Sequence, residues 1–589
     1  MPLRPAGCEA FLSRGIRFAG DARASRVCRL FQSLVALSLA AGSAFGQIEA
    51  DTQKNTIRGT VVNALTQMPI SRALVHSLDD RYAALTDGDG RFEFTLPKPE
   101  TDRGHSNRRM DVEITQGGGT RLDLAAQKPG FLEDYPNRRE VPAAPGSDIT
   151  IFLLPEGLIT GRVTASGEPV PDLHIQLFVK QVEDGLPRWR STTTARVNSS
   201  GEFRFAELSP GEYKLATNEG MDNDPAGIDP GAQPYAFPPV YFPTAADFSG
   251  AATIAVAAGQ TVEADLSVTR QPYYYVKIPI ANSDIAGGIN VSVEGQHGPG
   301  YSLGYNSATQ KIEGLLPAGN YVVEASTNGM NSMTGTVNLR VRNAPAEGPA
   351  MILVRNSSIS LDVKEEFSDT TWKGSKPIWN ARQRTWTASR GPRSYLEAGI
   401  EAADDDFTGS SRGAAGPNDS MVIENVAPGR YWLRLSSSRG YVASATLGGV
   451  DLLHEPLVVG SGSNMTVEVE MRDDGGKIDC TVPAMKALES SSDATARPGS
   501  SIPEMPVYFV PLPTGSGQFQ MMRIVGLKKF ESPLMAPGDY LVLAFANEQP
   551  VLPYRDAEAM RAYESKGAVV HVAAGQKVSV ELHVIADTE

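Results

Sequence analysis

Cysteine is scarce in this chain, which has three among 589 residues. Cys8 and Cys28 precede an apolar N-terminal run, so only Cys480 would remain once a leader is removed, and one cysteine cannot form an internal disulfide. Histidine is also rare, with seven scattered residues. No His-Glu-x-x-His pattern offers the ligand pair and general base of a zinc peptidase. We therefore expect domains stabilised by packing alone, with no catalytic residue, metal site or cofactor.

Excess positive charge and long apolar runs are missing as well. The formal net charge is -14, whereas binding to nucleic acid requires a basic surface that displaces counterions from phosphates. Beyond residue 41 no apolar stretch is long enough to span a bilayer. The chain instead contains 57 glycines and 41 prolines, which favour turns over long helices. We predict an all-β chain that neither binds nucleic acid nor spans a membrane.

The N-terminus has the features of an export signal. An arginine-containing lead is followed by the apolar run 30–41 and by small residues up to Gly46, the order that a signal peptidase reads. A buried core helix is the alternative, but the run is short, terminal and followed by polar sequence. We predict a signal peptide at 1–46 and export to the periplasm, the outer cell surface or the medium.

Internal repetition is the strongest signal. Four segments share an apolar strand end, a Pro/Gly turn and a tyrosine, and these tyrosines lie about 110 residues apart, close to the size of one sandwich domain: Tyr213, Tyr321, Tyr431 and Tyr540. A fifth copy is indicated at the front, where Gly90–Phe94 aligns with Gly201–Phe205. The predicted β-sandwich domains are 47–155, 156–270, 271–355, 356–473 and 474–589.

The corner before each tyrosine has a physical interpretation. Pro and Gly reverse the chain, and a strand with alternating apolar residues follows. Tyr213 and Leu215 should face one way while Glu212 and Lys214 face the other, as in a half-buried strand. The tyrosine ring should be buried, with its hydroxyl bonded to nearby backbone; contact with a ligand is the alternative. Further strands should follow Gly259-Gln260 and Gly575-Gln576, and Asp556–Ser565 predicts a short surface helix.

The first copy resembles a known domain family. The resemblance is carried by Ile57–Asn63, Pro69–Val75, Thr86–Phe94 and Ala126–Phe131, which are similar to the carboxypeptidase regulatory-like domain. It is clear over roughly the first two copies and rests on the corner and closing strand in the other three. It implies transthyretin-like or prealbumin-like β-sandwiches, grouped with starch-binding-like folds and common in tandem in exported proteins of Acidobacteria. It implies no peptidase activity.

Two local motifs allow competing interpretations. Gly409-Ser410-Ser411-Arg412-Gly413 matches the Gly-x-Ser-x-Gly pattern of hydrolases, but it lacks the preceding buried strand and following helix of a nucleophile elbow. We interpret it as a flexible loop. Asp87-Gly88-Asp89-Gly90 offers paired carboxylates to a hard cation, yet Asp-Gly is also a favoured hairpin turn, and we expect a plain turn there.

Three of the five tryptophans, Trp372, Trp379 and Trp386, are interleaved with lysines and arginines in the fourth copy. Exposed aromatic rings stack on sugars, and the cations would suit acidic groups on a polysaccharide or a partner protein. The alternative is an enlarged hairpin whose rings complete a local core, because tryptophan is mostly buried. These three residues are the candidate ligand-binding residues of the chain.

Three functions remain open from the sequence. The chain could be a secreted, non-catalytic binding protein that presents successive sandwiches to a polysaccharide or another envelope protein, with avidity gained by repetition. It could be a purely structural stalk or spacer. It could also be an accessory subunit of an exported hydrolase or transporter. Fold alone does not choose among them.

Overall fold

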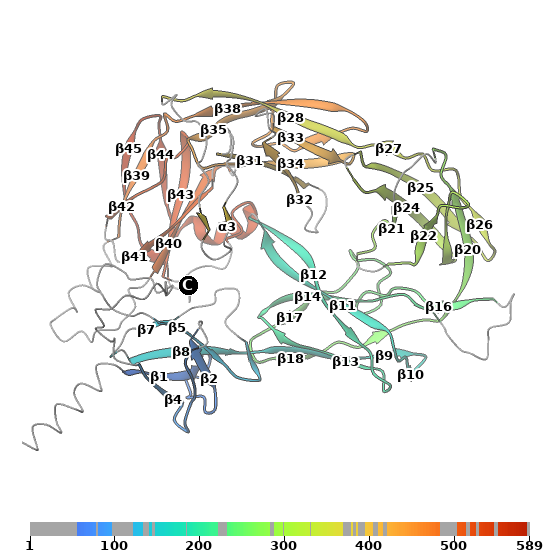
Figure 1. Ribbon diagram of the computed structural model, residues 1–589, viewed down its shortest axis with the longest axis horizontal. Helices are drawn as coiled ribbons and strands as arrows, with labels where there is room; N and C mark the ends of the chain where they lie inside the picture. The colour runs from blue at the N-terminus through green and yellow to red at the C-terminus, as the bar shows by residue number, and fades with distance from the viewer. Residues whose placement is uncertain are drawn as a thin grey trace, which may run out of the picture. The chain divides into compact units, whose positions relative to one another are not determined.

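The computed structural model is all-β, with one short helix among the residues it describes. These residues are 56–77, 81–96, 122–132, 141–143, 146, 148–183, 185–221, 233–282, 288–297, 300–329, 331–368, 379–380, 385–386, 395–403, 410–415, 421–482, 504–513, 519–525, 529–546 and 552–585. The strands form five β-sandwiches, numbered 1 to 5 in chain order and coloured from blue to red in Figure 1. The chain divides into two compact units: sandwich 1 makes most of the first, and sandwiches 2 to 5 make the second. The predicted signal peptide at 1–46 lies outside the described residues.

Sandwich 1 packs two four-stranded sheets, ordered β4-β1-β8-β6 and β3-β2-β5-β7. Both contribute to its core: Ile57 and Phe92 belong to the first sheet, Val75 and Leu124 to the second, and all four side chains are buried. The strands are β1 (Thr56–Asn63), β2 (Leu74–Ser77), β3 (Ala83–Leu85), β4 (Arg91–Thr95), β5 (Leu122–Gln127), β6 (Phe131–Leu132), β7 (Val141–Ala143) and β8 (Asp148–Pro155).

Sandwich 2 packs the sheet β10-β9-β13, joined by β18 and β19 alongside β9, against the sheet β12-β11-β14-β17. Apolar side chains from both sheets, among them Ile159, Phe203, Ile175 and Leu215, form one buried cluster. The strands are β9 (Gly157–Ala165), β10 (Glu168–Pro169), β11 (His174–Glu183), β12 (Leu186–Arg196), β13 (Glu202–Leu208), β14 (Gly211–Thr217), β17 (Ile254–Val256), β18 (Thr261–Glu263) and β19 (Leu266–Ser267).

Sandwich 3 contains two strands that come from the sequence of the second copy. Its first sheet is ordered β15-β16-β20-β23-β22, with β26 beside β20, and its second is β21-β24-β25-β27. Residues of β16 pair with the first residues of β20, so the hairpin crosses the boundary expected at residue 270. The strands are β15 (Gly220–Met221), β16 (Tyr235–Phe237), β20 (Gln271–Pro279), β21 (Ile289–Val293), β22 (Leu303–Asn306), β23 (Lys311–Pro317), β24 (Gly319–Thr327), β25 (Met333–Val341), β26 (Ala346–Glu347) and β27 (Val354–Arg355).

Sandwich 4 is built from one continuous path of strands, β36-β35-β38-β28-β33-β32-β31-β34-β37. The path folds over on itself, because residues from both of its halves, such as Ile359 and Leu433, share one buried cluster. The strands are β28 (Ser357–Glu366), β31 (Leu396–Ala402), β32 (Ser410–Ala415), β33 (Met421–Val426), β34 (Gly429–Ser437), β35 (Tyr441–Leu447), β36 (Val450–Asp451), β37 (Leu457–Val459) and β38 (Asn464–Arg472).

Sandwich 5 packs the sheet β42-β39-β45 against the sheet β41-β40-β43-β44, with β46 beside β43. Its strands are β39 (Lys477–Thr481), β40 (Glu504–Leu512), β41 (Gln520–Val525), β42 (Lys529–Glu531), β43 (Gly538–Phe545), β44 (Ala568–Val572), β45 (Lys577–Glu581) and β46 (Val584–Ile585). Helix α3 (Ala557–Glu564) lies beside them (Figure 1). The Asp556 side chain caps its N-terminus by accepting from the backbone N–H groups of Glu558 and Ala559. This is the short helix that the sequence predicts, and Met560 packs it onto the outer face of β40 and β43.

The corner tyrosines do what the repeat predicts. In all four copies the hydroxyl donates to the backbone carbonyl four residues earlier, at 2.6 Å for Tyr213, 2.9 Å for Tyr321 and Tyr431, and 2.8 Å for Tyr540. Burial raises the pKa of Tyr213 to about 12, because the charged phenolate would lose its hydration. The corners are structural, and each one joins the two layers of its sandwich.

The alternation predicted for β14 is present, but its second face is covered as well. Tyr213 and Leu215 belong to the core between the sheets, whereas Lys214 lies on the opposite face and is nevertheless buried. A second apolar cluster, which includes Trp189 and Phe248, covers that face of sandwich 2. The Lys214 ammonium donates to the Phe248 carbonyl at 3.0 Å and lies 5.0 Å from the Trp189 ring centroid. A lysine is tolerated there because its charge is met by a carbonyl oxygen and by aromatic faces.

Candidate functional site

The tryptophan segment contains a two-stranded hairpin. Strands β29 (Trp379–Asn380) and β30 (Thr385–Trp386) pair antiparallel, and Trp379 is the register partner of Trp386. Two of the three candidate residues are thus brought together by the backbone. Trp372 lies outside the described residues. The hairpin stands in sequence between β28 and β31 of sandwich 4.

The Asp87 turn is organised by backbone hydrogen bonds. One Asp87 carboxylate oxygen accepts from the N–H groups of Asp89 at 3.0 Å and Arg91 at 2.8 Å, and Gly90 takes a left-handed conformation. The second copy builds the same turn with the neutral Asn198, whose Oδ1 accepts from Ser200 and Glu202, each at 2.9 Å. A charge is therefore not needed for this geometry, which supports the plain turn.

The interpretation of Ser410–Gly413 as a flexible loop is wrong. These residues belong to β32 and pair with β31, while the last two residues of the strand, Ala414 and Ala415, pair with β33. Pairing along the strand provides partners for backbone groups of a polar segment that has no apolar alternation of its own. The serines therefore lie within a strand, and no strand-to-helix turn positions either of them as a nucleophile.

The remaining titratable residues are dispersed. Within the described ranges, no group of three or more histidine, cysteine or acidic side chains could hold a metal ion. Cys480 is buried in β39, and burial raises the pKa of its thiol to about 12. Such a thiol is a poor nucleophile, because the thiolate is the reactive form. Among the residues that the structure describes, no helix has the length and apolar character needed to cross a bilayer.

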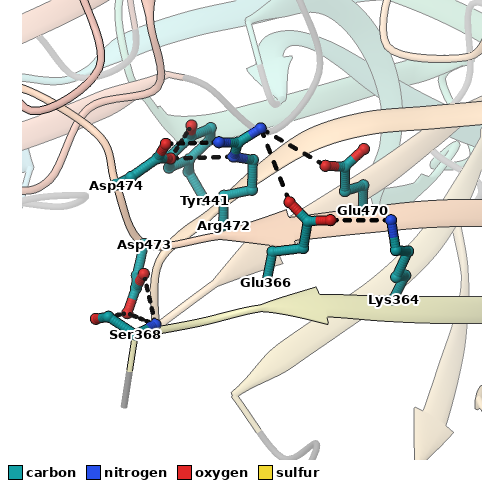
Figure 2. Close-up of polar contacts among 8 residues, drawn as sticks. All are labelled: Lys364, Glu366, Ser368, Tyr441, Glu470, Arg472, Asp473 and Asp474. Atoms are coloured by element: carbon teal, nitrogen blue, oxygen red, sulfur yellow. Dashed lines mark hydrogen bonds and ion pairs between the residues drawn. The ribbon is translucent and has the colours of Figure 1, made fainter. Parts of the chain in front are cut away.

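A polar cluster, the Asp474 joint, connects sandwiches 4 and 5 (Figure 2). The Arg472 guanidinium donates to both oxygens of Asp474, at 2.6 and 3.1 Å, and the Tyr441 hydroxyl donates to the same carboxylate at 2.8 Å. These bonds hold the pKa of Asp474 below its usual value, with Arg472 the larger cause. Asp473 accepts from the backbone N–H and the hydroxyl of Ser368. Both residues after β38 are therefore fixed to sandwich 4.

A recurring turn fixes the other side of this joint. The Asp474 carbonyl accepts from Gly575 N–H at 2.7 Å, and Lys477 N–H donates to the Gln576 carbonyl at 2.8 Å. The same arrangement introduces sandwich 2, where Pro155 accepts from Gly259 and Leu158 donates to Gln260. Both turns have the sequence Val-Ala-Ala-Gly-Gln, at 256–260 and 572–576. This motif, hereafter the Gly-Gln turn, holds the linker as well as preceding the predicted closing strand.

Sequence reasoning missed a buried ionic centre at Glu401. Its carboxylate accepts from Arg188 of sandwich 2 at 2.9 Å, from Arg434 of sandwich 4 at 2.5 Å, and lies 3.3 Å from a guanidinium nitrogen of Arg555, which precedes α3 of sandwich 5. Glu401 and Arg188 are both buried. Arg188 and Glu401 are more than 200 residues apart in the chain, so no pattern within a short segment of sequence could predict their contact.

Comparison with known proteins shows no relative by sequence. No family model matches the chain, and no curated protein matches it. Among solved structures, the Bacillus anthracis TIE protein is similar at 9% identity with a TM-score of 0.14, over 68% of this chain and 66% of that one. The Bacillus cereus major pilin BcpA has 12% sequence identity and a TM-score of 0.13, over 54% of this chain and 99% of that one. The Lactobacillus rhamnosus GG shaft pilin SpaA has 10% identity and a TM-score of 0.18, over 36% of this chain and 97% of that one. These values are too low to support a functional conclusion.

Proposed function

We propose that this chain is an exported, non-catalytic, multidomain binding protein of the cell envelope or exterior. Its ligand contact is the tryptophan hairpin of sandwich 4, and its ligand is a polysaccharide or another envelope protein. The observation that carries the proposal is the pairing of Trp379 with Trp386, since directly opposed residues of an antiparallel pair lie on one face. Arg382 and Arg384, in the same segment, would add positive charge for an acidic partner.

The repeated architecture supports this function. Each of sandwiches 2 to 5 has a buried apolar cluster of its own, so each can hold a loop in a fixed frame. We propose that 47–155, 156–270, 271–355, 356–473 and 474–589 are the domains, with the β15–β16 hairpin of the second packed into the third. The signal at 1–46 would direct the chain out of the cytoplasm.

Replacement of both hairpin tryptophans tests the binding proposal. We expect Trp379→Ala/Trp386→Ala, in the secreted chain, to lose retention on a glycan array or on purified envelope polysaccharide. The melting temperature should stay within about 2 °C of wild type, because a ring that contacts a ligand instead of the core would add little to stability. Trp372→Ala should weaken retention in the same direction.

The matched control is Trp189→Ala, which removes a buried ring. It should lower the melting temperature and leave retention by the folded fraction unchanged. The binding proposal fails if no glycan or envelope fraction is retained by wild type and the double variant melts several degrees lower. The hairpin rings are then core.

A structural spacer is the second candidate. The observation that favours it is the Asp474 joint, where hydrogen bonds fix the linker to sandwich 4 through its side chain and to sandwich 5 through its carbonyl. A spacer needs stiff joints and no ligand. The glycan experiment separates the two candidates, because a spacer retains no glycan.

A further inference from the structure

Strands β11 and β12 extend beyond the sheet to which they belong. The pairing of β11 with β14 ends at Val179, whereas its pairing with β12 continues through Lys180 to Glu183. Residues 180–183 and 186–189 therefore form a two-stranded arm beyond β14, and Trp189 at the base of the arm packs on sandwich 2. An isolated two-stranded hairpin is marginally stable in water, so an arm of this length requires a surface to pack on.

The tip of the arm packs on sandwich 5. Gly185 accepts a hydrogen bond from Arg555 N–H at 3.0 Å. A Cβ atom at Gly185 would lie 2.6 Å from the Tyr554 ring, and the residue has a φ of +79°. The Tyr554 ring in turn stacks on Phe519, with centroids 3.9 Å apart. Glycine is required at this position both by its backbone conformation and by the ring against which it lies.

The side of the arm packs on sandwich 4 through charge. Arg188 donates to Glu401 at 3.0 Å and to the Ala402 carbonyl at 3.0 Å, and its side chain is 5% exposed. Arg555 approaches the same carboxylate from sandwich 5 and lies over the Trp432 ring. The Glu401 carboxylate is buried and accepts from guanidinium groups of three sandwiches. If one sandwich moves away, part of the buried charge is left without a partner, which is strongly destabilising.

We propose that this arm, residues 180–183 and 185–189, forms a releasable clasp that holds sandwich 2 to sandwiches 4 and 5, with Glu401 as the residue on which the three converge. In the clasped state the arm covers Tyr554 and Glu401. In the released state the arm is unsupported, and the contacts of sandwich 2 with sandwiches 4 and 5 are lost. The clasp is independent of the tryptophan hairpin and of any ligand.

Glu401→Gln tests the clasp in the full-length mature chain. The amide keeps the size of the side chain but removes the charge and one acceptor oxygen, so it cannot satisfy the three guanidinium groups. We expect hydrogen exchange of the amides at 186–190 to accelerate about tenfold or more. Small-angle X-ray scattering should show a larger maximum dimension. Glu397→Gln is the control: this residue lies on the same face of β31 and is exposed, and the variant should match wild type.

A second variant separates the clasp from the stability of sandwich 4. Arg188→Gln alters the arm alone and leaves the Glu401–Arg434 pair within sandwich 4 intact. It should reproduce the faster exchange and the larger dimension. The proposal is overturned if Arg188→Gln matches wild type in both measurements, or if Glu401→Gln speeds exchange in β31 and β34 while residues 186–190 remain as protected as in wild type.

Discussion

At the scale of the residue, the corner tyrosine is the feature on which sequence and structure agree best. The tyrosine occurs at the same position in four copies of the repeat. A single tyrosine could be there by chance, but four at a near-constant spacing indicate a shared structural role. In each copy the ring packs between the sheets and the hydroxyl reaches the carbonyl four residues back. The sequence contained both partners of this bond within one short segment, which is why it could be predicted.

Tyr540→Phe measures what the corner hydroxyl contributes. The substitution keeps the ring and leaves the buried Ala536 carbonyl without its donor. We expect the opening free energy of β43, measured by native-state hydrogen exchange, to fall by about 1 kcal/mol. Tyr275→Phe is the control, since Tyr275 is 60% exposed. An unchanged opening energy in Tyr540→Phe would show that water replaces the hydroxyl.

At the scale of the element, prediction succeeded where the signal was local. Asp556 and the apolar spacing after it are neighbours in the chain, and α3 begins and ends where they indicate. Prediction failed where distant residues decide. Lys214 is buried because Trp189 and Phe248 cover it, and Ser410–Ala415 form a strand because β31 and β33 offer their edges. Neither partner can be identified from the segment itself.

The entry of the chain into sandwiches 2 and 5 depends on a glycine beside the Gly-Gln turn, Gly157 in the first case and Gly476 in the second. A Cβ atom at Gly476 would lie 2.3 Å from a methyl carbon of Val572 and 2.6 Å from the Ala573 carbonyl. We expect Gly476→Ala to lower the opening free energy of sandwich 5 by about 2 kcal/mol, as overpacking does, when measured by hydrogen exchange of β39. Gly460→Ala, where a Cβ atom meets open space, should change little. Equal effects in both would refute the steric argument.

At the scale of the whole molecule, the contacts between sandwiches could not be predicted from the sequence. The repeat gives the number of cores and the approximate size of each, because those depend on short-range patterns. Arg188 and Glu401 carry no such pattern, and neither does the pairing of Asp474 with Tyr441. The tryptophan candidates are intermediate: a hairpin was one of their two interpretations, and Trp379 and Trp386 do pair. Their contact with a ligand remains a prediction.

Asp474→Ala tests the stiffness of the joint between sandwiches 4 and 5. Spin labels at the exposed residues Val458 and Val569 would report the distance between the two sandwiches, while buried Cys480 should stay unlabelled in the native protein. Loss of the carboxylate removes the bonds that Arg472 and Tyr441 make to the linker, so we expect a broader distance distribution. Asp362→Ala, at an exposed position of β28, is the control. A distribution as narrow as wild type would mean that the backbone bonds alone hold the joint.

The β15–β16 hairpin has a consequence for how the protein is made. The ribosome finishes Phe237 before it begins Gln271, so β16 emerges while its partner β20 does not yet exist. At a synthesis rate of about 5–20 residues per second, the edge of β16 stays unpaired for seconds before β20 is made. An unpaired strand edge can form hydrogen bonds with another chain. The second copy therefore ends in a hairpin whose partner strand belongs to the third copy, and a chain truncated at residue 270 would carry β16 without β20.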